Sequence, residues 1–322
     1  MNVDQMSDVV VVPIEVMNSA FSLSLGLVVI KIRAVISPLV SWAKVCKPKT
    51  EGGLGLKNDV LWNKGAIGKL VWWVACKPDH LWVRWVNYTY LKGRPWQSYS
   101  PSTSSTWYWR KICQIKDIFA DAYQQNQWEN QIGKEYTRAK EYEWVRDKSD
   151  KVSWCNLVWT KWSLPKHSLL AWINHHGNLN TNSRLFNLGI RDDANCYLCG
   201  SDVEDLDHLF FNCHYSRKVV DFIKEWSALN IPYNDILRCR LSWNGAKEDK
   251  EVINAIVNAC MYHIWHQRNT SRVELRLLCL ESLLSRITSE LGTHFLVVAR
   301  RPEDRRGRLL MRLLGDQDDD ED

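Results

Sequence analysis

The sequence lacks the motifs that mark most nucleotide-binding enzymes and nucleophilic enzymes. Its glycine cluster at residues 52–55 (GGLG) has neither the GxGxxG nor the GxxxxGK[ST] spacing that places backbone amides around phosphates. No Ser-His-Asp or Cys-His constellation can be argued, because nine histidines and many single cysteines over 322 residues make chance pairs inevitable. We therefore interpret residues 52–55 as a turn and expect no small-molecule substrate.

Long uncharged runs are also scarce. The most apolar stretch, residues 9–30, follows two acidic residues and is interrupted by Pro13 and Glu15. Its uncharged part is too short to span a bilayer comfortably. We expect a buried or frayed N-terminal segment and no membrane element, and residues 1–36 are left without an assigned domain.

Paired cysteine spacings, the mark of a disulfide framework, are nearly absent. Seven of the ten cysteines are scattered singly along the chain: Cys46, Cys76, Cys113, Cys155, Cys239, Cys260 and Cys279. This distribution argues against disulfides and favours a reducing compartment, the nucleus or the cytoplasm.

The remaining three cysteines and one histidine have the spacing C-x2-C-x8-H-x4-C, formed by Cys196, Cys199, His208 and Cys213. Three thiolates and one imidazole complete a tetrahedral zinc shell and leave no open position for a metal-activated water. The array therefore predicts one structural zinc ion. The alternative is that buried cysteines and a core histidine lie near one another by chance, but the specific spacing makes this alternative the weaker one. We expect the neighbouring His214 to lie at the surface.

The same spacing makes a prediction about the backbone. His208 and Cys213 are five positions apart, which is about 140° around a regular helix. A helix that starts near Asp205 should therefore end or distort near Asn212, so that both ligands face inward.

The residues around the array are mostly acidic: Asp192, Asp193, Asp202, Glu204, Asp205 and Asp207, offset between 191 and 213 only by Arg191. Phosphate contacts need Lys and Arg. The array itself is therefore a poor candidate for contacts with nucleic acid.

Basic charge and aromatic side chains coincide upstream, in residues 41–116. This segment has thirteen Lys or Arg against three acidic residues, a surplus of ten, and nine of the eighteen tryptophans. It predicts an electrostatic footprint for RNA or single-stranded DNA, with exposed tryptophans stacking on unpaired bases. The candidate contacts are Lys44, Lys47, Lys49, Lys64, Lys69, Trp96, Trp107, Arg110 and Lys111. A helical core of inward-facing tryptophans under a solvated basic surface explains most of the same residues, and both interpretations can hold.

Apolar residues recur at helical spacing along most of the chain and predict a mainly α-helical fold. Thr181 is a plausible N-cap of a short helix that ends before Gly189, and residues 251–268 and 273–291 are expected to form a packed pair of helices separated at 269–271. The predicted organisation is a helical Trp-rich basic region at 37–120, a polar linker at 121–151, a small zinc-stabilised domain at 152–233, C-terminal helices at 234–299 and a disordered tail, basic then acidic, at 300–322.

Several motifs resemble one known family. Residues 196–199 (CYLC) and 207–213 (DHLFFNC), with 165–168 (PKHS) before them and 264–269 (IWHQRN) after them, resemble the zinc-binding region C-terminal to the reverse transcriptase of plant non-LTR (LINE-type) retrotransposons. Residues 41–56 and 107–111 resemble the segment that follows the polymerase thumb. His214 departs from the family pattern, which commonly has proline there.

The resemblance implies that the chain is part of an RNA-directed DNA polymerase polyprotein. The aromatic-x-Asp-Asp turn that holds two catalytic metal ions in a polymerase is, however, missing from the sequence. Asp192-Asp193 lies in the turn before the array and is not a credible catalytic pair. We therefore predict no catalytic residues and a zinc-binding accessory module that associates with RNA or single-stranded DNA through residues 41–116. The alternatives are a structural or protein-interaction zinc module, and a decayed retroelement fragment.

Overall fold

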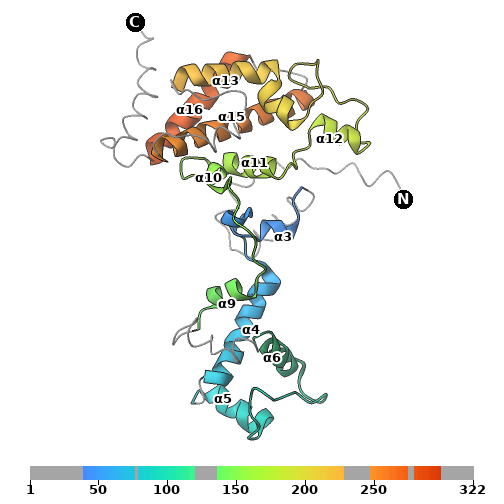
Figure 1. The fold of residues 1–322 in the computed structure, drawn as a ribbon, viewed down its shortest axis with the longest axis vertical. Helices are drawn as coiled ribbons and strands as arrows, with labels where there is room; N and C mark the ends of the chain where they lie inside the picture. Colours follow the sequence, from blue (N-terminus) through green and yellow to red (C-terminus); the bar gives the residue numbers. More distant parts are fainter. Residues whose placement is uncertain (1–38, 77–78, 120–135, 228–246, 275–278, 299–322) are drawn as a thin grey trace. The chain divides into compact units, whose positions relative to one another are not determined.

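The computed structural model describes residues 39–76, 79–119, 136–227, 247–274 and 279–298 (Figure 1). The described chain divides into two compact units, one formed by Cys46–Asp150 and the other by Lys151 onward together with the residues up to Val45. Helices are the regular elements of these residues, with no strand among them, which confirms the mainly α-helical prediction. In the same residues no helix is both long and apolar enough to cross a membrane. Residues 9–30, the first part of the predicted polar linker (121–135) and the tail lie outside the described ranges.

The Cys46–Asp150 unit is built around α4 (Asp59–Cys76), which packs against α6 (Trp107–Ile118) and α9 (Arg138–Val145). Between them come α5 (Leu81–Val86) and the π turn η3 (Asn87–Leu91). Side chains cap both later helices: His80 Nδ1 accepts the amide of Trp82 at α5, and Thr106 Oγ1 accepts the amide of Trp109 at α6. The core of this unit is aromatic and branched, and includes Val71, Trp72, Trp109, Ile112, Ile115 and Phe119.

Glycines permit two close approaches in this unit. Gly53 lies against the carbonyl group of Lys47, where a β-carbon would overlap the oxygen, and this confirms the predicted turn at 52–55. Gly68 on α4 faces the ring of Phe119 and the hydroxyl of Tyr136, each 2.9 Å from where a β-carbon would stand. Only a residue without a side chain lets α4 approach these two rings so closely.

The prediction of a linker at 121–151 is wrong for its later part. Residues Arg138–Val145 form α9, whose Tyr142 is buried and accepts a hydrogen bond from the amide of Asn58. Arg146 then forms ion pairs with Glu51 and Glu143 at 2.7 Å and 2.5 Å. The polar composition suggested a linker because the sequence does not show that Arg146 has a partner, Glu51, 95 positions away.

The second unit is organised around the long helix α15 (Lys247–Glu274), which contacts α10 (Cys155–Val158), α11 (Pro165–His175), α13 (His214–Ser227) and α16 (Leu280–Val298). The short helix α3 (Trp42–Val45) belongs to the same unit. Figure 1 shows α13, α15 and α16 side by side, with α11 along them. The predicted C-terminal pair is present as α15 and α16, which pack together.

The predicted break between those two helices is misplaced. Helix α15 continues through 269–271 to Glu274. The polar residues there do not end the helix, because their side chains have partners. The Ser271 hydroxyl donates to the carbonyl of Gln267 within the helix, and Arg268 donates to the buried Glu204. Thr181, in contrast, caps α12 (Asn182–Asn187) as predicted, with Gly189 following at a positive φ of 68°.

Candidate zinc centre

The first two candidate ligands come from a tight turn. Cys196 and Cys199 frame residues 196–199, and Gly200 closes the turn at a φ of 74°, with its amide donating to the carbonyl of Cys196 at 2.8 Å. The amide of Cys196 donates to the carbonyl of Asp202 at 2.8 Å, next to an antiparallel bridge between Asn195 and Val203. These bonds return the chain on itself and turn both sulfur atoms toward one point.

The other two candidate ligands come from a helical turn of unusual pitch. Asp205 Oδ1 accepts the amide of His208 at 2.6 Å, so the turn begins near Asp205 as predicted. Residues His208–Asn212 then form the π turn η4, closed by a bond from the amide of Cys213 to the carbonyl of His208 at 2.6 Å. This hydrogen bond from residue 213 back to residue 208 brings His208 and Cys213 together, and α13 starts at His214. The predicted distortion near Asn212 is confirmed.

The four ligand atoms form one cluster, all within 4.8 Å of one another. Cys196 Sγ lies 3.9 Å from Cys213 Sγ, and Cys199 Sγ lies 3.4 Å from His208 Nε2. Zinc bonds in tetrahedral geometry place two sulfurs about 3.8 Å apart and a sulfur and an imidazole nitrogen about 3.5 Å apart. The cluster therefore has the dimensions of a zinc shell. His214 is exposed, as predicted, and takes no part in it.

The protonation of the cluster also suits a cation. A hydrogen bond from the thiol of Cys196 lowers the pKa of Cys213 to about 5, while the same bond and burial raise the pKa of Cys196. A bound cation favours the loss of a proton from both thiols.

A buried ion pair supports the turn from behind. Glu204 accepts the amide of Asn182 at 2.8 Å and the amide of Tyr197 at 3.3 Å, and its carboxylate accepts Arg268 Nε at 2.9 Å. Arg268 Nη2 also donates to Asn182 Oδ1 at 2.8 Å. The pair ties the cysteine turn and α12 to the central helix α15.

The sequence interpretation missed this pair. Glu204 was counted among the acidic residues around the array, but it is fully buried and neutralised, and the exposed acidic groups are Asp192, Asp193, Asp202, Asp205 and Asp207. The available signal was Arg268 itself, a charged residue that follows the buried face of α15 at Ile264. An arginine in that position needs a buried acid, and the sequence does not say which one.

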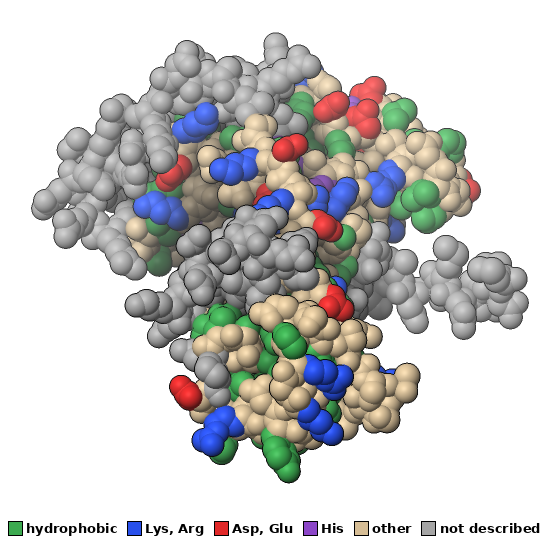
Figure 2. Space-filling model, turned by 60° about the horizontal axis from the view of Figure 1, so that its bottom comes forward, with side chains coloured by type: hydrophobic (Ala, Val, Ile, Leu, Met, Phe, Trp, Pro, Cys, Tyr) green, Lys and Arg blue, Asp and Glu red, His purple; other side chains and the backbone are tan. Residues whose placement is uncertain are grey.

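The candidate nucleic-acid residues separate into different environments. Lys44 belongs to the second unit, whereas the other candidates belong to Cys46–Asp150. Lys49, Lys69 and Arg110 are exposed, and Lys47, Lys64 and Lys111 are half-buried. On the face that Figure 2 shows, Lys and Arg side chains are spread over the surface and form no single patch. Over residues 46–150, seventeen Lys or Arg against eleven acidic residues leave a surplus of six, which is smaller than the surplus of the 41–116 segment.

Of the two tryptophans expected at the surface, Trp107 is 70% exposed and Trp96 only 6% exposed. The expectation for Trp96 is wrong because its ring packs against Trp109, with ring centroids 5.7 Å apart, and lies under the ammonium of Lys116. Lys116 is itself buried and donates to three backbone carbonyls, of which Tyr99 is the nearest at 2.6 Å. It is therefore occupied within the core and does not add to the basic surface.

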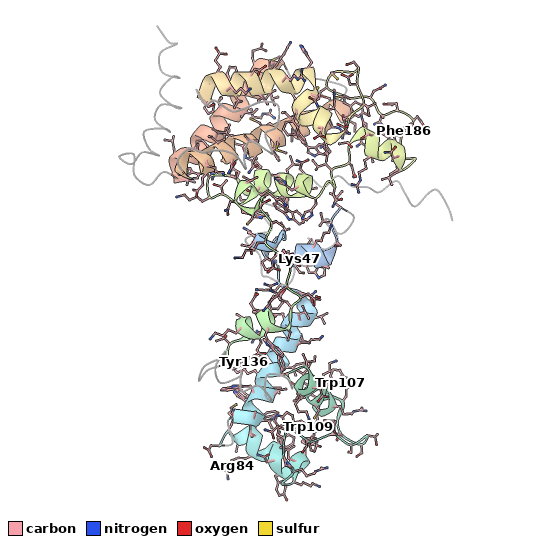
Figure 3. The ribbon with its side chains drawn as sticks, in the orientation of Figure 1. Lys47, Arg84, Trp107, Trp109, Tyr136 and Phe186 are labelled. Atoms are coloured by element: carbon pink, nitrogen blue, oxygen red, sulfur yellow. The ribbon has the colours of Figure 1, made fainter. Side chains whose placement is uncertain are left out.

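Four exposed aromatic side chains form what we call the aromatic surface: Trp85, Tyr88, Trp107 and Tyr108. Tyr90 packs edge-on against Trp85 at 5.6 Å, and its hydroxyl contacts Thr106 Oγ1 at 3.3 Å, one residue before Trp107. Figure 3 shows Trp107 on the outer side of α6, away from Arg84. Trp85, Tyr88 and Tyr108 were not predicted as contacts, because spacing alone does not separate exposed from buried rings in a Trp-rich segment.

The structure thus defines a helical chain with a Cys3His cluster supported by its longest helix. Residues 136–219 match the family model described as zinc-binding in reverse transcriptase. A protein of Arabidopsis thaliana named "Putative ribonuclease H protein At1g65750" is 36% identical over 73 residues, which are 21% of this chain and 12% of that protein. The chain therefore covers only a small part of this relative. No solved structure matches the chain.

The family match identifies residues 136–219 as a reverse-transcriptase zinc-binding domain, which confirms this part of the resemblance noted from the motifs. Such a domain is an accessory part of the protein and not its catalytic part. The matched range contains all four residues of the Cys3His cluster and begins upstream of the predicted domain start at 152, before helix α9.

Proposed function

We propose that this chain is an accessory module of a retroelement reverse transcriptase, in which one structural zinc ion stabilises the Cys3His region and the Cys46–Asp150 unit binds single-stranded RNA or DNA. The observation that carries the binding proposal is the aromatic surface, with two cationic side chains close to it on α6. We infer no catalytic step, because the cluster uses four protein ligands and leaves no position for a substrate or a reactive water.

The zinc proposal is supported by the donor set, its dimensions and the matched family. Its test is the metal content of the purified full chain. We expect the thiol reagent p-hydroxymercuribenzoate to release one equivalent of zinc, and Cys199→Ser to lose that equivalent. Cys155→Ser is the matched control, since Cys155 lies outside the cluster. Less than about half an equivalent in the unmodified chain would contradict the proposal.

The binding proposal rests on stacking more than on charge. Bases stack on exposed aromatic side chains with about 1–3 kcal/mol per base. Arg110 and Lys111 follow Trp107 by three and four positions, so they lie one turn away on α6 and can reach the phosphates of a stacked strand. Two such contacts predict a slope of about −1.4 for log K against log salt on a single strand.

The experiment measures the affinity of the full chain for unstructured RNA and single-stranded DNA across a salt series. We expect Trp107→Ala to weaken binding about fivefold or more, which corresponds to the lower end of the stacking energy. The matched control is Phe186→Ala, which removes an exposed ring from the other unit (Figure 3) and should leave affinity unchanged. For charge, Lys111→Gln should flatten the salt slope by about 0.7, and Lys218→Gln on α13 should not.

A protein-interaction module is the alternative outcome of the same experiment. If neither nucleic acid binds at low salt, or if Trp107→Ala and Phe186→Ala behave alike, the aromatic surface does not bind nucleic acid. The zinc assay is unaffected by that result, so the two parts of the proposal fail separately.

A further inference from the structure

A second group of metal-binding side chains lies outside the Cys3His cluster. His167 on α11, His263 on α15 and Glu290 on α16 bring their ligand atoms within 4.8 Å of one another. His167 Nε2 lies 3.0 Å from Glu290 Oε1, and His263 Nε2 lies 3.4 Å from Glu290 Oε2. The three residues come from three helices that pack together in the second unit.

Three ring nitrogens of the two buried histidines lack a hydrogen bond of accepted geometry. His167 is fully buried and neither of its ring nitrogens makes such a bond, and the same holds for Nε2 of His263, whose side chain is 3% exposed. Buried polar atoms in this state cost stability unless a partner is bound between them.

We propose that His167, His263 and Glu290 bind a second zinc ion. Zinc–nitrogen and zinc–oxygen bonds in tetrahedral geometry place neighbouring ligand atoms about 3.3–3.4 Å apart, and each atom then points at the ion and not at its neighbour. This arrangement accounts for both the short distances and the missing hydrogen bonds. Two imidazoles and one carboxylate are a donor set that zinc uses in proteins.

The charge states fit a cation as well. Burial lowers the pKa of His167 to about 4, so its ring is neutral at pH 7 and offers a lone pair. Burial raises the pKa of Glu290, and the nearby groups of His167, His263 and Lys166 lower it by more, so the net shift favours the charged carboxylate.

One neighbour opposes the ion. The ammonium of Lys166 lies 2.8 Å from Glu290 Oε1, where its charge repels a cation and occupies part of the carboxylate. Lys166 and Glu290 are both 23% exposed and mark the side of the group that solvent reaches. Three protein ligands leave one position there for a water molecule. Removing the ammonium should therefore tighten zinc binding, an effect that a mere histidine–glutamate–lysine ion network does not predict.

The test uses the full chain dialysed against zinc, with bound metal measured before and after p-hydroxymercuribenzoate. The mercurial attacks thiolates, so it releases the Cys3His zinc and spares an ion held by imidazole and carboxylate. We expect two equivalents in total, one of which resists release. Glu290→Gln and His263→Gln should lose the resistant equivalent and keep the releasable one, which also shows that the unit remains folded.

The matched control is His266→Gln, on the exposed side of the same helix, which should keep both equivalents. Lys166→Gln should raise the affinity of the resistant equivalent. The proposal is overturned if the unmodified chain and Lys166→Gln both lack a resistant equivalent, or if Glu290→Gln retains it.

Discussion

Replacing Arg268 tests how the zinc-binding region is held to the rest of its unit. Its guanidinium is fully buried and donates to Glu204, which is fully buried too. Arg268→Met keeps much of the side-chain volume but leaves the Glu204 carboxylate without a countercharge. Removal of one partner from a buried ion pair costs about 3–5 kcal/mol. Since Glu204 keeps two backbone donors, at Asn182 and Tyr197, we expect about 3 kcal/mol.

The chain has two compact units, so a single unfolding midpoint does not report this energy cleanly. Hydrogen exchange of the Asn182 and Tyr197 amides is the better assay, because both amides donate to Glu204. A loss of about 3 kcal/mol in opening free energy accelerates exchange about a hundredfold. Arg286→Met on α16 is the matched control, an exposed arginine whose loss should change exchange by less than about twofold.

Equal exchange in Arg268→Met and Arg286→Met would refute this reasoning. A second variant sharpens the test: Glu204→Gln combined with Arg268→Met removes both charges and should recover part of the loss. Contacting residues in one network show coupling of about 0.5–3 kcal/mol, so a purely additive double variant would also contradict the argument.

Three further predictions concern stability and metal. Chelation of zinc, or Cys199→Ser, should abolish the exchange protection of the Cys196 and Gly200 amides while leaving α4 protected, and retained protection would count against a structural metal. Gly68→Ala should destabilise the Cys46–Asp150 unit by about 1–3 kcal/mol in thermal unfolding, because its β-carbon meets the Phe119 ring, whereas Gly65→Ala, with its nearest neighbour at 3.5 Å, should be neutral or stabilising. Burial raises the pKa of Glu141 to about 7, so the folded unit binds this proton more tightly than the unfolded chain, and stability should fall as pH rises from about 4.5 through 7. Glu141→Gln should remove that fall, and an unchanged pH profile would contradict the assignment.

The clustering of the four Cys3His residues could be predicted from spacing, because the chemistry of zinc restricts both residue type and local geometry. The five-residue step from His208 to Cys213 even predicted where the helix distorts. The cluster and the helix distortion both depend on residues that are close together in the sequence, and the geometry of such residues can be predicted from their spacing.

The remaining errors share one cause, which is contact between residues far apart in the chain. Trp96 and Trp107 lie in the same Trp-rich segment, yet one packs on Trp109 and the other faces solvent. The pair of Glu204 and Arg268 spans 64 positions. His263 likewise finds its neighbours His167 and Glu290 on two other helices.

The structure moves the nucleic-acid hypothesis from charge to stacking. The Cys46–Asp150 unit has a surplus of only six positive charges. Two of its cations already have partners within the unit, because Lys116 donates to backbone carbonyls in the core and Arg146 pairs with Glu51 and Glu143. What remains distinctive is the aromatic surface, whose large rings stay in water although the same unit buries others of their kind. Exposed rings of this size favour partners with flat faces, and unpaired bases supply them. We therefore expect the affinity for single-stranded nucleic acid to fall strongly in Trp107→Ala and to depend only weakly on salt concentration.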